Sequence, residues 1–186
     1  MELVLFAAIV AAAVGLIRGG TLASLAETRF RWQWLLFVAL AVQILFSYWA
    51  PEGWTRAGLR WVLLASTAGI AAFLVINFRV PGMLVAALGL ALNVTVIASN
   101  SAMPVSESAA KTAGAGSRGV DGGFKHEPLD DDTTLPVLAD VIPVPVTRSV
   151  LSVGDVLLVA GIAYLVYRRT AAGRRRGRHS FTAASG

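Results

Sequence analysis

Residues 80–103 read VPGMLVAALGLALNVTVIASNSAM, a run of 24 residues that contains no Asp, Glu, Lys or Arg. A helix needs about 20 mostly apolar residues to cross the hydrocarbon core of a bilayer, so this run predicts a transmembrane helix. Four further charge-poor apolar runs lie along the chain, at residues 3–17, 32–50, 61–78 and 149–167. The chain is therefore expected to cross a membrane five times.

The composition agrees with a membrane protein. Hydrophobic residues make up 56% of the 186 residues and the mean hydropathy is +0.68, which exceeds the apolar share of ordinary soluble domains. A chain of this length with five spans forms one membrane domain over residues 1–186. The expected fold class is all-α, a polytopic helical membrane bundle of five transmembrane helices with one long outer loop folded back on the bundle.

The positions of the arginines predict the orientation. With an odd number of spans, the 18–31 loop, the Arg79 turn and the tail at 168–186 share one face and carry three, one and six arginines. The other face carries six basic residues, and four of them lie in a long loop that counts little in the positive-inside rule. We therefore expect the N-terminus outside and the C-terminus in the cytoplasm. Arginine outnumbers lysine by 14 to 2, which favours a GC-rich bacterial source and hence the bacterial cytoplasmic (inner) membrane.

The basic cytoplasmic tail, residues 168–186, directly follows the last apolar run. Its six arginines suit the headgroups of anionic lipids, so the expected partners are the lipid bilayer and, at this tail, anionic lipid. No recognition fold accompanies the charge, and no nucleic-acid partner is expected. The chain has no cysteine, which excludes disulfides and thiol nucleophiles. No cofactor motif and no metal site is expected.

The outer loop, residues 101–150, has two parts of different composition. Residues 106–123 are rich in Ala, Gly and Ser and are expected to be flexible. Residues 124–150 mix apolar, proline and charged residues, so they are expected to fold back onto the outer mouth of the bundle. Candidate residues at this mouth are Asn100, Lys125 and His126, and a protein partner is expected to bind the outer loop.

Four spans place a polar residue at a similar depth. At about 1.5 Å of helix per residue, Asp155 lies about 20 Å from Arg168, inside the membrane. The same count places Gln43, Ser66 and Asn93 at about 18–21 Å from their nearest arginines. These three residues form a predicted polar layer. Gln43 and Asn93 are expected to hydrogen-bond between helices rather than to bind a ligand.

Two interpretations of Asp155 remain open. An ionisable residue inside a membrane is a candidate functional residue, and a second carboxylate, Asp140, precedes it in the outer loop. Alternatively, Ser152-Val153-Gly154-Asp155 fits a capping box, in which Asp155 bonds to the N-terminus of the last helix. The catalytic candidates are therefore Asp155 and Asp140, with a structural cap as the alternative.

Several segments resemble a family of bacterial membrane proteins that is known as domain of unknown function 5317. The resemblance covers nearly the whole chain, and the family brings no established activity. It implies the same membrane topology and adds no chemistry. The matching segments are Arg18-Gly19-Gly20-Thr21-Leu22, Arg29-Phe30-Arg31-Trp32, Asn100-Ser101-Ala102-Met103-Pro104-Val105, Lys125-His126, residues 138–145 and Ser152-Val153-Gly154-Asp155.

Three functions are compatible with the sequence. The favoured one is a non-enzymatic membrane component or interaction partner that uses its outer loop. The alternative is an intramembrane aspartyl-type hydrolase with Asp140 and Asp155, which would loosely resemble lipoprotein signal peptidases, although their Asn-x-x-Asp-Arg element is absent here. The third is a small-solute transporter that uses the polar layer, and the lack of an inverted repeat counts against it.

Overall fold

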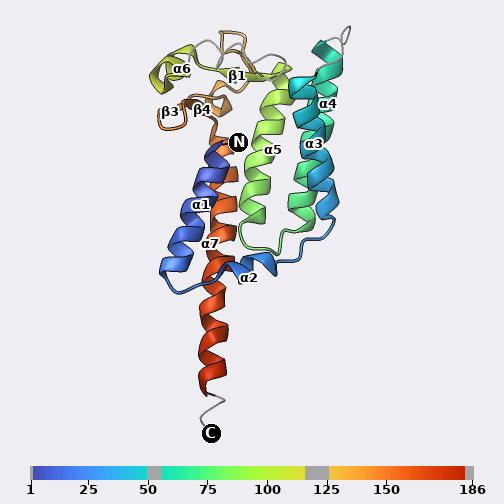
Figure 1. Cartoon of the computed structure of the whole chain (residues 1–186). Helices are drawn as coiled ribbons and strands as arrows, with labels where there is room; N and C mark the ends of the chain where they lie inside the picture. Colours follow the sequence, from blue (N-terminus) through green and yellow to red (C-terminus); the bar gives the residue numbers. More distant parts are fainter. Residues whose placement is uncertain (1, 50–55, 116–125, 183–186) are drawn as a thin grey trace.

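The computed structural model describes residues 2–49, 56–115 and 126–182, which are mostly helical. Five long helices run side by side, and we call the segments that cover one end of them, residues 101–115 and 126–152, the cap (Figure 1). Helix α7 extends well beyond the other helices at the opposite end. The long helices are α1 (Glu2–Ile17), α3 (Gln33–Tyr48), α4 (Arg56–Ile76), α5 (Met83–Asn100) and α7 (Val153–Thr182).

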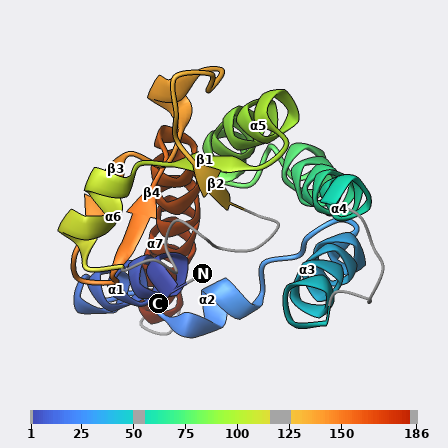
Figure 2. The same ribbon diagram turned by 90° about the horizontal axis from the view of Figure 1, so that it is seen from above.

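Seen along their axes, the long helices form an open arc in the order α1, α7, α5, α4, α3 (Figure 2). Neighbours in this order pack against each other, and the contact between α5 and α7 is the most extensive. The short helix α2 (Leu22–Ala26) lies at the end opposite the cap, in the connection between α1 and α3, and packs against α7. The first and last helices of the chain are therefore neighbours in space.

Helices α5 and α7 approach closely because glycines face each other across their contact. A Cβ added at Gly89 would lie 2.3 Å from the carbonyl oxygen of Gly154. A Cβ added at Gly161 would lie 2.6 Å from the amide nitrogen of Ala86. Small residues of this kind let two helix backbones touch, as they commonly do in membrane bundles. Polar side chains on the two helices can therefore reach one another directly.

Asn77 joins the end of α4 to the segment that precedes α3. Its side chain accepts a hydrogen bond from the Arg31 amide at 2.8 Å and donates to the Arg31 carbonyl at 2.9 Å. It also donates to the Phe73 carbonyl at 2.8 Å. The adjacent apolar core is formed by buried side chains from α4, α5 and α7, namely Phe73, Leu74, Met83, Ala86, Ala87, Leu90 and Leu165.

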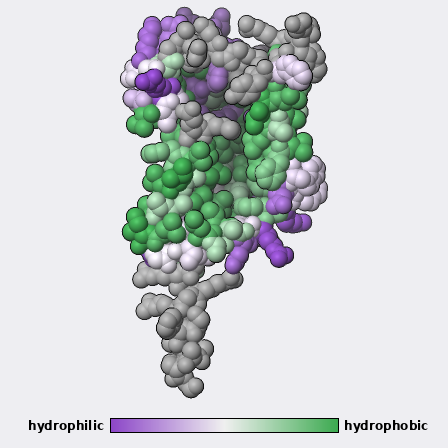
Figure 3. Space-filling model, in the orientation of Figure 1, coloured by the Kyte–Doolittle hydropathy of each residue, from purple (hydrophilic) through white to green (hydrophobic). Residues whose placement is uncertain are grey.

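On the face shown in Figure 3, apolar residues occupy the middle of the molecule, between more polar surfaces at its two ends. Leu5, Phe37, Val75 and Leu84 are each more than half exposed. Among the described residues, one helix, Met83–Asn100, is long and apolar enough to cross a membrane, as judged by its length and its composition. Shorter apolar helical stretches are found at Leu3–Ile17, Gln33–Phe46 and Trp61–Ile76.

The cap contains two small sheets and a short helix. Strand β1 (Met103–Val105) pairs in parallel with β2 (His126–Pro128), and β3 (Ile142–Val144) pairs antiparallel with β4 (Ser149–Leu151). Helix α6 (Glu107–Ala113) follows β1, and the 3-10 helix η2 (Pro136–Leu138) precedes β3. The cap has an interior of its own, since Val105, Ala110, Ala139 and Ser152 are at most 1% exposed.

The cap corrects two expectations. Its four strands make the fold mostly helical rather than all-α. Strands of three residues are too short to show an alternating pattern, which explains why the sequence did not indicate them. The segment 106–123, expected to be flexible, forms α6 in its described part. Ser106 caps this helix by accepting from the Ala109 amide at 3.3 Å, and three of its alanines are buried. Residues 116–123 lie outside the described residues.

Several helix boundaries also differ from the expected spans, among them the starts of three helices. The fourth span was expected to begin at residue 80, but α5 begins at Met83 because Gly82, with a φ of 86°, turns the chain just before it. The fifth was expected from residue 149, whereas residues 149–151 form β4 and α7 begins at Val153. Helix α4 begins at Arg56, five residues before the expected 61.

Candidate functional site

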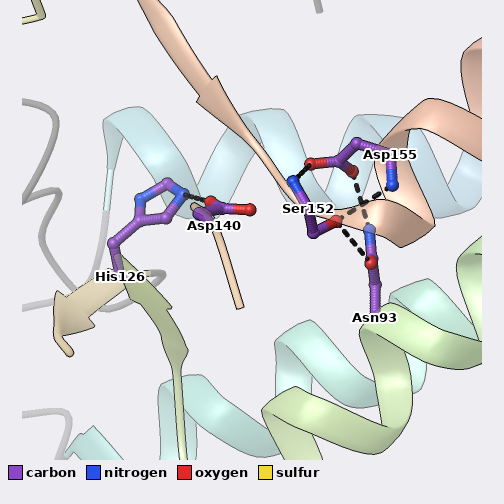
Figure 4. A network of polar contacts seen from close by, with 5 residues as sticks. All are labelled: Asn93, His126, Asp140, Ser152 and Asp155. Atoms are coloured by element: carbon purple, nitrogen blue, oxygen red, sulfur yellow. Dashed lines mark hydrogen bonds and ion pairs between the residues drawn. The ribbon is translucent and has the colours of Figure 1, made fainter. Parts of the chain in front are cut away.

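Five polar side chains gather where the cap meets α5 and α7 (Figure 4). Asn93 lies on α5, Asp155 lies in the first turn of α7, and Ser152 is the residue that precedes α7. His126 and Asp140 belong to the cap, His126 at the start of β2 and Asp140 two residues before β3. The close packing of α5 against α7 brings the first three together, and the pairing of the cap strands positions the other two.

Ser152 and Asp155 form a reciprocal capping box. The Asp155 amide donates to Ser152 Oγ at 2.9 Å, and the Ser152 amide donates to Asp155 Oδ2 at 3.2 Å. These are the contacts that the Ser-x-x-Asp spacing predicts. They provide acceptors for two amides that have no partner within the helix. At least part of the role of Asp155 is therefore structural.

Asn93 connects this capping box to α5. Its Nδ2 donates to Asp155 Oδ1 at 2.7 Å, and Ser152 Oγ donates to Asn93 Oδ1 at 2.9 Å. Asn93 is 9% exposed and Ser152 is fully buried. Asn93 is thus a hydrogen-bonding group between helices, as its position in an apolar run indicated.

Asp140 is fixed by its backbone and buried in the cap. Its amide donates to the Pro104 carbonyl, and its carbonyl accepts from the Ser106 amide, both at 2.9 Å. The residue is 5% exposed. Its Oδ2 lies 3.9 Å from His126 Nε2, and within the described part of the chain its Oδ1 has no hydrogen-bond partner. A buried polar atom without a partner is rare and is often found at functional sites.

Burial, and secondly the negative charge of Asp155, raise the pKa of the Asp140 carboxyl from 3.8 to about 8. Asp140 is therefore protonated at neutral pH, and its contact with His126 is not an ion pair there. Asp155, in contrast, accepts hydrogen bonds with both of its oxygens. Two carboxyl groups in different environments can divide the roles of acid and base between them.

At the outer mouth, Asn100 holds a turn of the cap against the end of α5. Its Nδ2 donates to the Thr134 carbonyl and its Oδ1 accepts from the Thr134 amide, both at 2.7 Å. A pocket of about 460 Å³ lies beside this contact, and its lining includes Glu127, Asp130 and Asp132. Asp130 Oδ1 in turn accepts from the Asp132 amide at 3.1 Å, which stabilises the acidic turn.

The remaining candidates of the polar layer lie apart from this cluster. Gln43 on α3 donates to Thr67 Oγ1 on α4 at 3.1 Å, and Ser66 donates to the Leu63 carbonyl within α4 at 2.9 Å. The four polar residues of similar depth therefore do not form one continuous network through these contacts. This leaves the transporter hypothesis without a structural observation in its favour. Lys125, also expected at the mouth, lies outside the described residues.

The sequence did not single out every residue of these networks. Ser152 was considered only as part of a capping box, and its bond to Asn93 depends on a contact between distant segments. Thr67 and Asn77 were not selected, although both are polar residues inside the apolar run 61–78 and could have been found by that criterion. Among the described residues, no group of three or more His, Asp or Glu side chains could hold a metal ion.

The chain belongs to a family of unknown function, DUF5317, whose model matches residues 27–167. The match includes α3, α4, α5 and the described cap, together with α7 as far as Tyr167. No curated protein and no solved structure matches the chain. All five residues of the cluster in Figure 4 fall within the matched range.

Proposed function

We propose that this DUF5317 member is an integral membrane protein whose five long helices, α1, α3, α4, α5 and α7, all cross the bilayer. The exposed apolar side chains between two polar ends support this proposal (Figure 3). A contiguous apolar surface of this extent would be unfavourable in water. Trp32 and Trp34, stacked at the end opposite the cap, and Trp61, at the cap end of α4, suit the two membrane interfaces.

We propose that the cap lies outside and the C-terminus in the cytoplasm of a bacterium, with the chain in the inner membrane. The end opposite the cap carries arginines from several connections, and the positive-inside rule assigns such an end to the cytoplasm. The arginines of the tail would then face the inner leaflet, where anionic lipids are the partners that match their charge. The arginines at the end opposite the cap, by the elements that carry them, are Arg18, Arg29, Arg31, Arg79, Arg168 and Arg169.

Within this arrangement the protein acts as a non-enzymatic membrane component that binds a protein partner through its cap. The observation that carries this function is the ordered interior of the cap, because a plain connection between two helices needs no buried residues of its own. The cap nevertheless leaves Val137 and Val146 exposed, at 77% and 82%. These two exposed apolar side chains are available to a protein partner.

Site-specific photocrosslinking in cells tests this function. A photoreactive residue at Val137 or Val146 should give a discrete crosslinked protein, whereas one at Leu88, 56% exposed on α5, should crosslink only lipid. The product should be lost when Asn100→Ala detaches the acidic turn of the cap. The absence of a discrete product from both cap positions would contradict the proposed interface.

A second candidate is peptide hydrolysis by Asp140 and Asp155. It is favoured by Oδ1 of the protonated Asp140, which has no hydrogen-bond partner among the described residues. Asp155 would take a proton from a water molecule whose oxygen bonds to the peptide carbonyl carbon, while Asp140 would protonate the carbonyl oxygen. The C–N bond would then break as the nitrogen takes up the proton held by Asp155, while a hydroxyl of the tetrahedral intermediate returns its proton to Asp140. The two hydrogen bonds that Asp155 already accepts weigh against this role.

The two functions differ in their response to Asp140→Asn, which retains the shape of the side chain but cannot donate an acidic proton. A hydrolase would lose all cleavage products, detectable as new N-termini of membrane proteins in cells that express the wild type. Asp131→Asn, an exposed carboxylate in the same cap, is the matched control and should leave those products unchanged. Products that persist with Asp140→Asn would exclude the hydrolase.

A further inference from the structure

At the end of the bundle opposite the cap, two arginines lie over tyrosine rings of α7. The Cζ atom of Arg18 lies 5.6 Å from the ring centroid of Tyr167, and its Nη1 donates to Tyr167 Oη at 2.6 Å. The Cζ atom of Arg168 lies 5.8 Å from the ring centroid of Tyr164. These contacts hold each guanidinium in place while leaving N–H donors available, since a guanidinium carries five.

The four side chains form one patch across α1 and α7. Residues 164, 167 and 168 lie on one face of α7 because they are separated by three and four positions. Arg18, at the end of α1, reaches this face through Tyr167. Within the described residues, neither the ion pair of Lys111 with Glu107 nor the contact of His126 with Asp140 includes either arginine. In the part of the chain that the structure describes, neither of these two positive charges therefore forms an ion pair with a carboxylate.

Exposed apolar and aromatic side chains precede each of the two arginines on its own helix. Leu16 and Ile17, directly before Arg18, are 41% and 85% exposed, and the Tyr164 ring is 47% exposed. The patch therefore offers a cationic end next to an apolar surface. An inorganic anion would bind only the cationic end. A molecule with both a phosphate and acyl chains would bind the cationic end and the apolar surface.

We propose that Arg18 and Arg168 bind the phosphate of an anionic glycerophospholipid, whose acyl chains lie along the exposed apolar side chains of α1 and α7. This inference rests on the proposed membrane insertion, with this end at the cytoplasmic leaflet. It differs from a general attraction of the tail to the membrane, because it assigns one site to two helices that are far apart in the sequence. A lipid bound there also bridges α1 and α7.

Native mass spectrometry of the full chain in detergent tests the site, with phosphatidylglycerol, phosphatidylcholine and inorganic phosphate as separate probes. Phosphatidylglycerol should bind best. Arg18→Gln and Arg168→Gln should each weaken its binding about fivefold, the effect typical of one arginine near a membrane surface. Arg79 lies 5.4 Å over the Phe78 ring at the same end, in the connection between α4 and α5 rather than on α1 or α7, so Arg79→Gln is the matched control.

Equal weakening by all three substitutions would show a diffuse electrostatic effect and overturn the site. Inorganic phosphate that competes with phosphatidylglycerol at a similar concentration would show an anion site instead and overturn the lipid assignment. Arg168→Gln keeps the test decisive if Arg18→Gln disturbs the packing of α1. Failure of the proposed membrane insertion is a separate result, seen as release of the wild-type chain from membranes by alkaline carbonate washing.

Discussion

At the scale of single residues, Asp140 shows how burial changes the chemistry of a carboxyl group. Its side chain has lost most of its contact with water, and Oδ1 gains no hydrogen bond in return within the described residues. The ionised form loses the most from this desolvation, so the neutral form prevails at neutral pH. The titratable groups that face it are His126 from β2 and Asp155 from α7.

We predict that Asp140→Asn makes the protein less sensitive to high pH. Because the folded pKa of Asp140 is raised from 3.8 to about 8, its contribution to stability is fully present below pH 3.8 and is lost as the pH rises to about 8. Between pH 5 and pH 8 the wild type should lose up to about 4 kcal/mol that the variant keeps, at about 1.36 kcal/mol per pH unit.

Thermal unfolding in detergent at pH 5, 7 and 9 measures this difference. The melting temperature of Asp140→Asn should rise relative to the wild type as the pH increases, whereas Asp131→Asn should follow the wild type. Parallel pH profiles for the wild type and Asp140→Asn would mean that the carboxyl is already ionised at low pH.

Asp155 allows a second prediction about a single residue. As a capping residue, it acts through acceptor oxygens, so Asp155→Asn retains one acceptor and should be mild. Asp155→Leu removes both acceptors and should destabilise the protein by about 0.5–2 kcal/mol, the range measured for lost helix caps. Chemical denaturation of both variants would measure this. A larger loss of unfolding free energy in Asp155→Asn than in Asp155→Leu would contradict the capping role.

Local sequence patterns predicted some of these residues and not others. The capping box is contained in four consecutive residues, so its spacing was enough to indicate it. The burial of Asp140 depends on backbone bonds to Pro104 and Ser106, more than 30 positions away. Such pairing leaves no local pattern, which explains why Asp140 could be named as a candidate while its environment could not be foreseen.

At the scale of helices and strands, apolar runs indicated where the long helices lie, and turns decided where they begin. Helix α5 starts three residues later than expected because the backbone of Gly82 is in the left-handed region. The strands of the cap were missed because prolines and β-branched residues in three-residue segments resemble an irregular loop. Helix α2 was missed because five residues are too few for a helical period.

The glycine contacts between α5 and α7 support a prediction for Gly154→Ala. The new Cβ would lie 1.9 Å from Asn93 Oδ1 and 2.5 Å from the Gly89 carbonyl oxygen, so the helices must separate. Overpacking of this kind costs about 1–3 kcal/mol. Gly69→Ala on α4 is the matched control, since its Cβ would meet its nearest neighbour, Ala39 Cβ, at 3.4 Å.

Thermal unfolding of the two glycine variants compares these positions directly. Gly69→Ala should be neutral or slightly stabilising, because alanine favours the helix over glycine. Gly154→Ala should unfold at a lower temperature and should also weaken the Asn93–Asp155 bond. Equal melting temperatures for the two variants would mean that α5 and α7 do not pack as closely as the glycines indicate.

At the scale of the whole molecule, composition and the apolar runs predicted a helical bundle with an outer loop folded back on it, but not the order of its helices. The arc α1, α7, α5, α4, α3 depends on which small residues meet, and small residues occur in every apolar run. The pairing of α1 with α7 rests partly on Gly15, where a Cβ would lie 2.7 Å from the Thr170 Cβ. Nothing in the sequence distinguishes this glycine among the 18 in the chain, so its contact with α7 could not be predicted.

The proposed orientation leads to a prediction that the absence of cysteine makes easy to test, because any introduced cysteine is the only one in the chain. Asp131→Cys on the cap should react with a membrane-impermeant maleimide in intact cells. Ala26→Cys, exposed on α2 at the other end, should react only after the inner membrane is permeabilised, because that end faces the cytoplasm. Ala86→Cys, fully buried between helices, should react only after unfolding and serves as the control. Labelling of Ala26→Cys but not Asp131→Cys in intact cells would reverse the orientation and place the cap in the cytoplasm.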